Sequence, residues 1–318
     1  MLGSAIGLGL WLFRQLQETA NAVPQLPASK GRPALLSDKT RRRHAAVFGQ
    51  SGAGKSRFLE SLIILDALRR VTGQSRRGVA MIEVHGDLYG NSRSRLALMA
   101  LRYPVLDELV VLIDPTFSDW TVQYNPLELR PGDVPERRAT MLARTFTTVY
   151  HDDPTTVVRL FRVMYHAFLT LLLAGLTLLE LPLLLRDKHY REAVVSAVDH
   201  PEVHAYWLLE FPRDPEDGMV RVESTLNRLG RFVSDPDIAA LLRGPSTINF
   251  RELMDRGAIV LVNAAKGRIG EDNAYLLCAF ILAEIQQAAL GREAVPERER
   301  TPFSLVCDEF ANYTTDTI

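Results

Sequence analysis

The chain has 318 residues, of which 47% are hydrophobic and 24% are charged, and its formal net charge is −1. This length and apolar content suit one large core or two ordinary ones. The near-zero net charge excludes a global positive field, so any contact with DNA must come from local patches or from assembly into a ring. Cys278 and Cys307 both lie in apolar runs, which predicts buried thiols in a reducing cytoplasm and not a disulfide.

Residues 1–40 predict an apolar leader followed by a linker. The stretch from Leu2 to Phe13 is apolar, but a complete membrane span needs about 20 residues. It also lacks the basic start of a signal peptide. We therefore expect either the stub of a membrane helix or an interfacial or disordered leader. Residues 20–40 contain three prolines and several small polar residues, which is typical of a linker.

Residues 41–130 predict the first part of an α/β core. A short strand is expected at residues 45–48, followed by a glycine-rich turn and a helix that reaches about Val71. The apolar face of this helix would contain Phe58, Leu62, Leu65 and Leu68, which recur at helical spacing. Further strands are expected at 79–84 and 109–113. Strands that alternate with helices indicate a parallel sheet.

Residues 131–245 predict an all-helical insertion, with helices at 135–150, 155–174, 187–198 and 216–233. The apolar run 168–185 could be mistaken for a membrane span, but Gly175, Glu180 and Pro182 interrupt it, so we favour a buried helical hairpin. Thr177 and Glu180 form a capping-box pattern that starts a new short helix. Pro182 would cost that helix one backbone hydrogen bond.

Residues 246–318 predict the second part of the core. An apolar strand is expected at 258–262, a helix at 271–290, and a last strand at 303–307. Glu271 and Asp272 suit the positive N-terminal end of this helix. The sequence therefore predicts an α/β core that a helical insertion divides.

The stretch GQSGAGKS, from Gly49 to Ser56, satisfies the P-loop pattern G-x-x-x-x-G-K-S/T between an expected strand and an expected helix. Its glycines let the backbone curl and aim N–H groups at a β-phosphate, and the helix adds its positive end. Lys55 would bridge β- and γ-phosphate oxygens, and Ser56 would bind Mg²⁺. The predicted ATP-binding residues are Gly49, Gln50, Ser51, Gly52, Ala53, Gly54, Lys55, Ser56 and Arg57.

The acidic pair Asp308-Glu309 directly follows the last predicted strand. Phosphoryl transfer needs a second carboxylate near the metal and a group that polarises the attacking water. We predict that Asp308 lies on the magnesium side and that Glu309 polarises water, so that Glu309 and Lys55 are the catalytic residues. The alternative is a solvated acidic turn after a core strand.

Several stretches, taken in order, resemble the type IV secretion coupling proteins of the TraG/TraD type, which are hexameric DNA-translocating ATPases related to HerA and FtsK. The stretches are RHAAVFGQSGAGKS, VAMIEVHGDLY, IDPTFSDWTVQYNPLE, GAIVLVNAAKGRIGEDNAYLL and LVCDEFANY. The resemblance runs from about Arg43 to the C-terminus. It implies a RecA-like P-loop NTPase fold with a mainly parallel sheet and a helical insertion, and ATP hydrolysis coupled to DNA movement through a homo-hexamer.

The resemblance also implies partners and a location. A relaxase and secretion-channel components would be the partners, at the cytoplasmic face of a bacterial inner membrane, with the N-terminus as the membrane contact. Two rival functions stay open. One is a HerA-like DNA-processing translocase or a secretion ATPase that moves no DNA, and the other is a nucleotide-binding interaction module without turnover.

This sequence departs from the family pattern in the loop at residues 83–87. The relatives usually have Asp-Pro-x-Gly-Asp there, whereas this chain has Glu-Val-His-Gly-Asp. Asp87 is a candidate nucleotide-side carboxylate, with an ordinary turn as the alternative, and His85 is interpreted as a loop histidine rather than a catalyst. Lys266 and Arg268 are candidates for an arginine finger or belong to a solvated basic loop.

Two further features lie near the ends of the sequence. Arg41, Arg42 and Arg43 could contact DNA backbone or anionic lipid, although a short run of charge is usually solvated. The family continues after the acidic pair with a glutamine-bearing sensor strand that this sequence does not contain. We therefore expect a truncated chain that binds nucleotide but hydrolyses it poorly.

Overall fold

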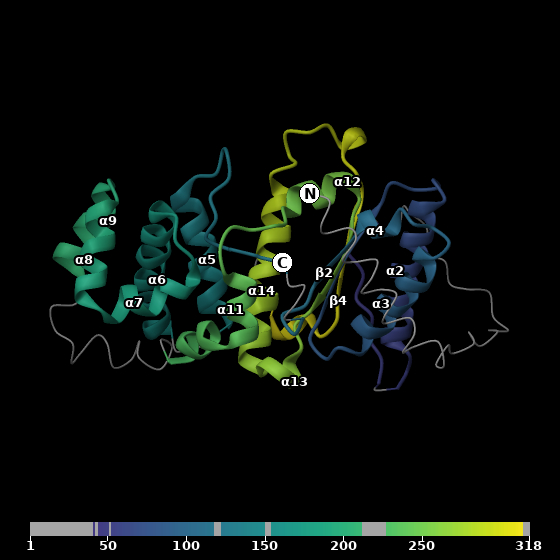
Figure 1. Cartoon of the computed structure of the whole chain (residues 1–318), viewed down its shortest axis with the longest axis horizontal. Helices are drawn as coiled ribbons and strands as arrows, with labels where there is room; N and C mark the ends of the chain where they lie inside the picture. Colours follow the sequence, from purple (N-terminus) through teal and green to yellow (C-terminus); the bar gives the residue numbers. More distant parts are fainter. Residues whose placement is uncertain are drawn as a thin grey trace.

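The computed structural model describes residues 41, 44–50, 52–117, 122–149, 154–211 and 227–313, and within them the chain forms an α/β fold (Figure 1). The predicted leader and linker lie outside these residues. Four strands, β1 (Gly78–Glu83), β2 (Val110–Ile113), β3 (Ile259–Asn263) and β4 (Phe303–Cys307), pair in the order β2-β3-β1-β4. All three pairings are parallel. Four of the five predicted strands are therefore confirmed, to within one residue at each end.

The two central strands are buried along their whole length. Every residue of β1 and of β3 is buried, as expected of a parallel sheet that is covered on both faces. Val79 and Met81 of β1 pack toward one helical layer, and the alternate residues Ala80 and Ile82 pack toward the other. The edge strands β2 and β4 are only partly buried.

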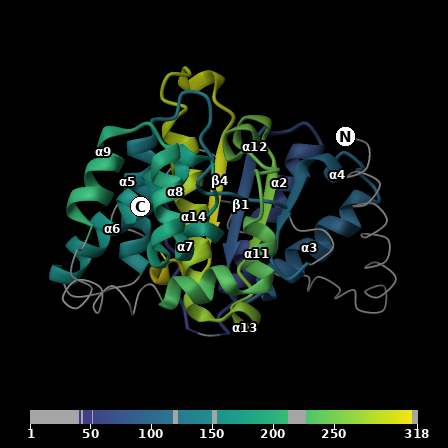
Figure 2. The same ribbon diagram turned by 60° about the vertical axis from the view of Figure 1, so that its left-hand side comes forward.

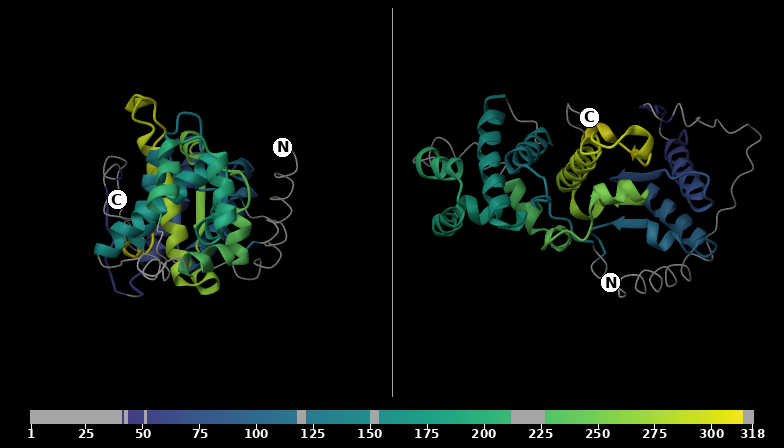
Figure 3. Two further views of the ribbon diagram at one scale, coloured as in Figure 1. Left: turned by 90° about the vertical axis from the view of Figure 1, so that its left-hand side faces the viewer. Right: turned by 90° about the horizontal axis from the view of Figure 1, so that it is seen from above.

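Helices cover both faces of the sheet, as the views in Figures 2 and 3 show. On one face lie α2 (Lys55–Val71), α3 (Asp87–Ala100) and α4 (Leu106–Leu109). On the other face lie α12 (Phe250–Arg256) and α14 (Glu271–Leu290), with the short helix α13 (Lys266–Ile269) before α14. The predicted bounds of α14 are confirmed.

The described residues between β2 and β3 form helices and turns but no strand. The elements are α5 (Pro135–Val149), α6 (Pro154–Ala174), η2 (Leu178–Glu180), α7 (Leu181–Arg186), α8 (Lys188–Ala197), α9 (Pro201–Ala205), the π-helical turn η3 (Tyr206–Glu210), a helix at 227–234 and α11 (Pro236–Leu242). They extend to one side of the sheet (Figure 1). The predicted helices are confirmed, except that residues 216–226 lie outside the described residues.

This helical region shares one hydrophobic cluster with the α14 face of the sheet, which contains both Ile82 of β1 and Phe168 of α6. A buried ion pair also joins the two, because Arg138 of α5 lies 2.6 Å from Glu284 of α14. Burial in the cluster raises the pKa of Glu284, against the lowering effect of Arg138. The helical region is therefore packed onto the sheet and not tethered beside it.

The predicted break in the apolar run 168–185 is confirmed. Helix α6 ends at Ala174, Gly175 has a φ of 67°, and the capping box of Thr177 and Glu180 starts η2. The Thr177 N–H donates to Glu180 Oε2 at 2.8 Å. The expected cost of Pro182 is wrong, because Pro182 lies in the first turn of α7, where no intrahelical partner is lost.

Two helices are long and apolar enough to span a membrane, at Val157–Ala174 and Glu271–Leu290. More than half of each is buried inside the fold, at 56% and 61%. A buried core helix passes the same test of length and composition, so these two helices carry little weight for a membrane location.

The predicted strand at 45–48 is wrong. Residues 44–50 have no regular secondary structure and are exposed, with Phe48 87% exposed. A strand needs a neighbour to bond its backbone groups. Within the described residues no strand pairs with this segment, and β4 pairs only with β1.

The predicted helix after the P-loop is confirmed, but the apolar residues at helical spacing are not the ones that it buries most. Leu68 is 40% exposed, and the buried residues are Glu60, Ile63, Asp66 and Ala67. The two acidic side chains are buried because arginines neutralise them. Arg95 of α3 lies 2.6 Å from Glu60, and Arg41 donates to Asp66 at 2.6 Å.

Candidate functional site at the carboxyl ends of the strands

The P-loop segment forms a tight turn before α2. Gly52 and Gly54 have φ of 79° and 90°, a region that favours glycine. The Lys55 Nζ donates to the backbone carbonyls of Gly49 and Gln50 at 2.7 and 3.2 Å. No side chain caps the start of α2, so its first N–H groups are available to an anion. Ser51 lies outside the described residues.

Chain direction brings the start of α2 toward the carboxyl ends of the strands. Helix α2 ends at Val71, and β1 begins at Gly78 after a short connection. Because α2 packs on β1 and runs antiparallel to it, the first turn of α2 lies toward the carboxyl end of β1. In Figures 1 and 2 the purple P-loop segment is at the lower end of the fold, where α13 follows β3. Open α/β sheets bind ligands at this edge.

Each strand delivers a polar side chain to this edge. Glu83 ends β1, Asp114 follows β2, Asn263 ends β3 and Asp308 follows β4. The Asn263 Nδ2 donates to Asp114 Oδ2 at 2.9 Å. The sequence prediction missed Asp114 and Asn263. The signal that could have identified them is the first polar residue after, or at the end of, an apolar run.

Glu83 holds the loop that precedes α3. Its carboxylate accepts from the N–H groups of Leu88 and Tyr89 at 2.8 and 2.5 Å, and Gly86 has a φ of 100°. Burial raises the pKa of Glu83, and the charges of Asp308 and Asp87 raise it further. Glu83 therefore caps a helix, whereas Asp87, the predicted nucleotide-side carboxylate, is exposed.

The backbone of Asp308 is fixed from two sides. Its N–H donates to the Ile82 carbonyl at 3.1 Å, which extends the pairing of β4 with β1. The buried Tyr313 donates its hydroxyl to the Asp308 carbonyl at 2.7 Å. Burial raises the pKa of Cys307, just before Asp308, to about 12. Cys307 and Cys278 are both free thiols, as predicted, but only Cys278 is fully buried and Cys307 is half-buried.

Glu309 contacts a residue of the loop that follows β1. The Nε2 of His85 lies 2.8 Å from Glu309 Oε1, and the two side chains are 43% and 41% exposed. The sequence analysis interpreted His85 as a loop histidine without a catalytic role. The structure brings it to a predicted catalytic residue.

Two non-glycine residues in the described part of the chain have a positive φ, Ala265 at 48° and Glu309 at 51°. Ala265 follows β3 and Glu309 follows β4, so both lie at the carboxyl ends of the strands. Backbone strain of this kind costs roughly 1–3 kcal/mol and clusters at functional sites.

The two basic candidates after β3 have partners within this chain. Lys266 lies 3.1 Å from Glu271. Arg268 donates to both carboxylate oxygens of Asp237, at 2.6 and 3.1 Å, and so joins α13 to α11. These contacts are those of surface ion pairs, and the arginine-finger role stays a prediction.

Ser56 and Asp308 stay the predicted ligands of Mg²⁺. Ser56 offers an exposed hydroxyl and Asp308 a carboxylate, and hard oxygen ligands suit this ion. The described residues contain no cluster of three or more His, Cys, Asp or Glu that could hold a metal ion. Mg²⁺ in nucleotide sites takes one or two protein oxygens together with phosphates and water, so Ser56 and Asp308 match that need.

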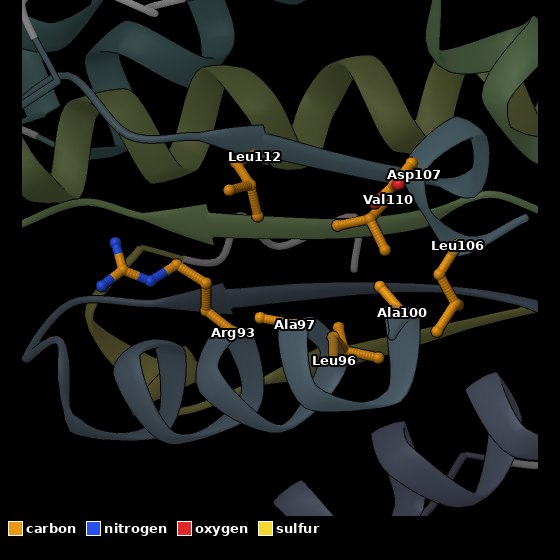
Figure 4. A pocket seen from close by; sticks show the side chains of 8 residues that line it. All are labelled: Arg93, Leu96, Ala97, Ala100, Leu106, Asp107, Val110 and Leu112. Atoms are coloured by element: carbon orange, nitrogen blue, oxygen red, sulfur yellow. The ribbon is translucent and has the colours of Figure 1, made fainter. Parts of the chain in front are cut away.

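A small pocket lies elsewhere, between α3, α4 and β2 (Figure 4). Arg93 and Asp107 lie toward its two ends, and its other lining residues, Leu96, Ala97, Ala100, Leu106, Val110 and Leu112, are apolar. None of the P-loop residues and neither residue of the acidic pair lines it. This pocket is therefore separate from the candidate site.

No protein-family model and no curated protein matches this chain.

Proposed function

We propose that this chain is a P-loop ATPase with a RecA-like core, a motor similar to the coupling proteins of type IV secretion. The observation that carries the proposal is that two sequence motifs lie toward the same end of the sheet, at the carboxyl ends of its strands. A glycine-rich loop with Lys55 at a helix start lies toward the edge where Asp308-Glu309 follows a strand. These are the two elements that nucleoside triphosphate hydrolysis requires.

The P-loop would bind the triphosphate by exchanging contacts. Lys55 Nζ, now bonded to the carbonyls of Gly49 and Gln50, would turn to β- and γ-phosphate oxygens. The uncapped N–H groups of α2 would face the β-phosphate. Ser56 and Asp308 would hold Mg²⁺, which neutralises charge on the phosphates.

Glu309 would polarise the attacking water. Its side chain is 41% exposed, so water can reach it. A positioned general base contributes about 10²–10⁴-fold to a rate. Asp308, one residue earlier, would keep the metal side while Glu309 faces the γ-phosphate.

The motor function would couple this hydrolysis to DNA movement. Support comes from the resemblance to the coupling proteins, with a relaxase and secretion-channel components as partners and the N-terminus as membrane contact. With a formal net charge of −1, a single protomer has little attraction for DNA. Binding would therefore need a ring, and it would weaken steeply with salt because the contacts would be to phosphate.

The substitution Lys55→Ala tests nucleotide binding. We expect the affinity for a fluorescent ATP analogue, measured by titration with Mg²⁺, to fall by about 100-fold, because at least two charge-assisted hydrogen bonds are lost. Lys188→Ala, at an exposed lysine of α8, is the matched control and should bind as the parent does. An unchanged affinity in Lys55→Ala would remove the P-loop assignment.

A further inference from the structure

The contact between His85 and Glu309 joins two loops through the pairing of their strands. Ile82 of β1 is in register with Cys307 of β4. The segments that follow β1 and β4 then leave the sheet side by side, one toward His85 and the other toward Glu309. Sheet register, and not sequence proximity, therefore makes the 2.8 Å contact between Nε2 and Oε1.

The backbone on both sides restricts this contact. Glu309 has a φ of 51°, and its N–H donates to the carboxylate of Asp308 at 3.1 Å. Gly86, next to His85, has a φ of 100°, and the loop is held by the buried Glu83. Both side chains therefore project from loops with defined geometry, which suits a contact that orients a group.

A second carboxylate lies near His85 but is otherwise engaged. Hydrogen bonds from Tyr275 and Lys266 lower the pKa of Glu271, with a smaller electrostatic contribution from the nearby His85. Glu271 Oε1 accepts from the Tyr275 hydroxyl at 2.6 Å and from Lys266 Nζ at 3.1 Å. Glu309 is thus the carboxylate that His85 bonds.

We propose that His85 is a positioning residue, which holds Oε1 of Glu309 so that Oε2 faces the attacking water. The proposal rests on the proposed ATPase function. In the step it serves, the water oxygen bonds to the γ-phosphorus while the bond from that phosphorus to the β–γ bridging oxygen breaks. The electron pair leaves with ADP, and the water proton passes to Glu309.

Three substitutions of His85 distinguish a role in positioning Glu309 from a purely structural role. Gln places its amide nitrogen where His places Nε2, whereas Asn places it where His places Nδ1. In single-turnover hydrolysis with the full chain in excess over ATP, we expect His85→Ala and His85→Asn to lose about tenfold in maximal rate, a part of what a general base contributes. His85→Gln should keep most of the rate, and the half-saturating protein concentration should not move.

Rates equal to that of the parent in all three variants would overturn the proposal. So would a faster His85→Ala, which would make the contact an inhibitory latch, or a half-saturating concentration that rises with the loss of rate. Equal losses in His85→Gln and His85→Ala would show that the ring shape and not the Nε2 contact is needed.

A second measurement needs neither nucleotide nor turnover. The ring ¹⁵N resonances of His85 report whether Nε2 donates a hydrogen bond. We expect them to shift in Glu309→Ala and to stay in place in Glu271→Gln, the matched change of the neighbouring carboxylate. Unchanged resonances in Glu309→Ala would show that His85 and Glu309 do not form this contact. A confirmed contact in a chain that neither binds nor hydrolyses ATP would instead contradict the proposed function alone.

Discussion

His166 of α6 is a buried histidine without a partner for one of its ring nitrogens. It is 7% exposed, and its ring stacks on Tyr206 with the centroids 3.8 Å apart. Among the described residues its Nδ1 has no hydrogen-bond partner. Burial lowers the pKa of His166 to about 4, and Arg162 contributes to the lowering. The folded state therefore holds the imidazole neutral.

This residue makes stability depend on pH. Between about pH 6.5 and 4 the unfolded chain binds a proton at His166 that the folded chain does not, so acidification through this window favours unfolding. We expect the free energy of unfolding to fall by about 2–3 kcal/mol more in the parent than in His166→Phe, which keeps the stacking on Tyr206. Urea denaturation at several pH values measures this difference. Parallel pH profiles for the two proteins would contradict it.

For single residues, the sequence predicts those that a short motif identifies. Lys55, Asp308 and Glu309 were found because short patterns place them, and the structure puts the acidic pair directly after β4. The contact of His85 with Glu309 could not be predicted, because it depends on which strands are neighbours. The same holds for Asn263 and Asp114, whose hydrogen bond joins β3 and β2.

Among the secondary-structure elements, those with strong local signals were predicted best. Helix α14 and strand β4 have the predicted bounds. The apolar residues of α14 recur at helical spacing after an acidic first turn, and β4 is a mostly apolar segment between Pro302 and Asp308. The apolar spacing of α2 could not reveal its buried residues, since two of them are acidic side chains that Arg41 and Arg95 neutralise. The segment 45–48 has strand-like composition but no neighbour to pair with in the described sheet.

The turn between α12 and β3 needs a glycine for two reasons. Gly257 has a φ of 68°, and a Cβ there would lie 2.3 Å from the Arg76 carbonyl oxygen. Gly73, at the end of α2, has a φ of 71°, but a Cβ there would meet nothing within 4 Å. A side chain at either position would therefore strain the backbone, but only one at Gly257 would also clash with a neighbouring atom.

We expect Gly73→Ala to cost about 1–2 kcal/mol of stability, the cost of a left-handed conformation. Gly257→Ala should cost about 1–3 kcal/mol more, because the backbone must also move to admit the methyl group. Thermal or urea denaturation of both variants measures this difference. Equal losses would mean that the α12–β3 turn yields without strain.

The described residues form a parallel sheet between two helical layers, with a further helical region packed against α14 (Figure 3). Alternation of strands and helices predicted the parallel sheet, but not the order β2-β3-β1-β4, since that depends on crossovers between distant segments. The order makes β1 the neighbour of β4, which brings the loop at 83–87 to the acidic pair. The site therefore exists only in the folded chain, because its parts come from both ends of the sequence.

The substitution Glu309→Gln tests whether these distant parts form one ATP-hydrolysing site. Gln keeps the size of the side chain but cannot accept the water proton, so chemistry should fail while binding survives. Glu192→Gln, at an exposed residue of α8, is the control. The measurement is the rate of phosphate release in a single turnover with protein in excess. We predict a loss of about 100-fold or more in Glu309→Gln, with nucleotide affinity unchanged. A rate within about threefold of the parent would contradict the account, since that change is small beside the 10²–10⁴-fold of a general base.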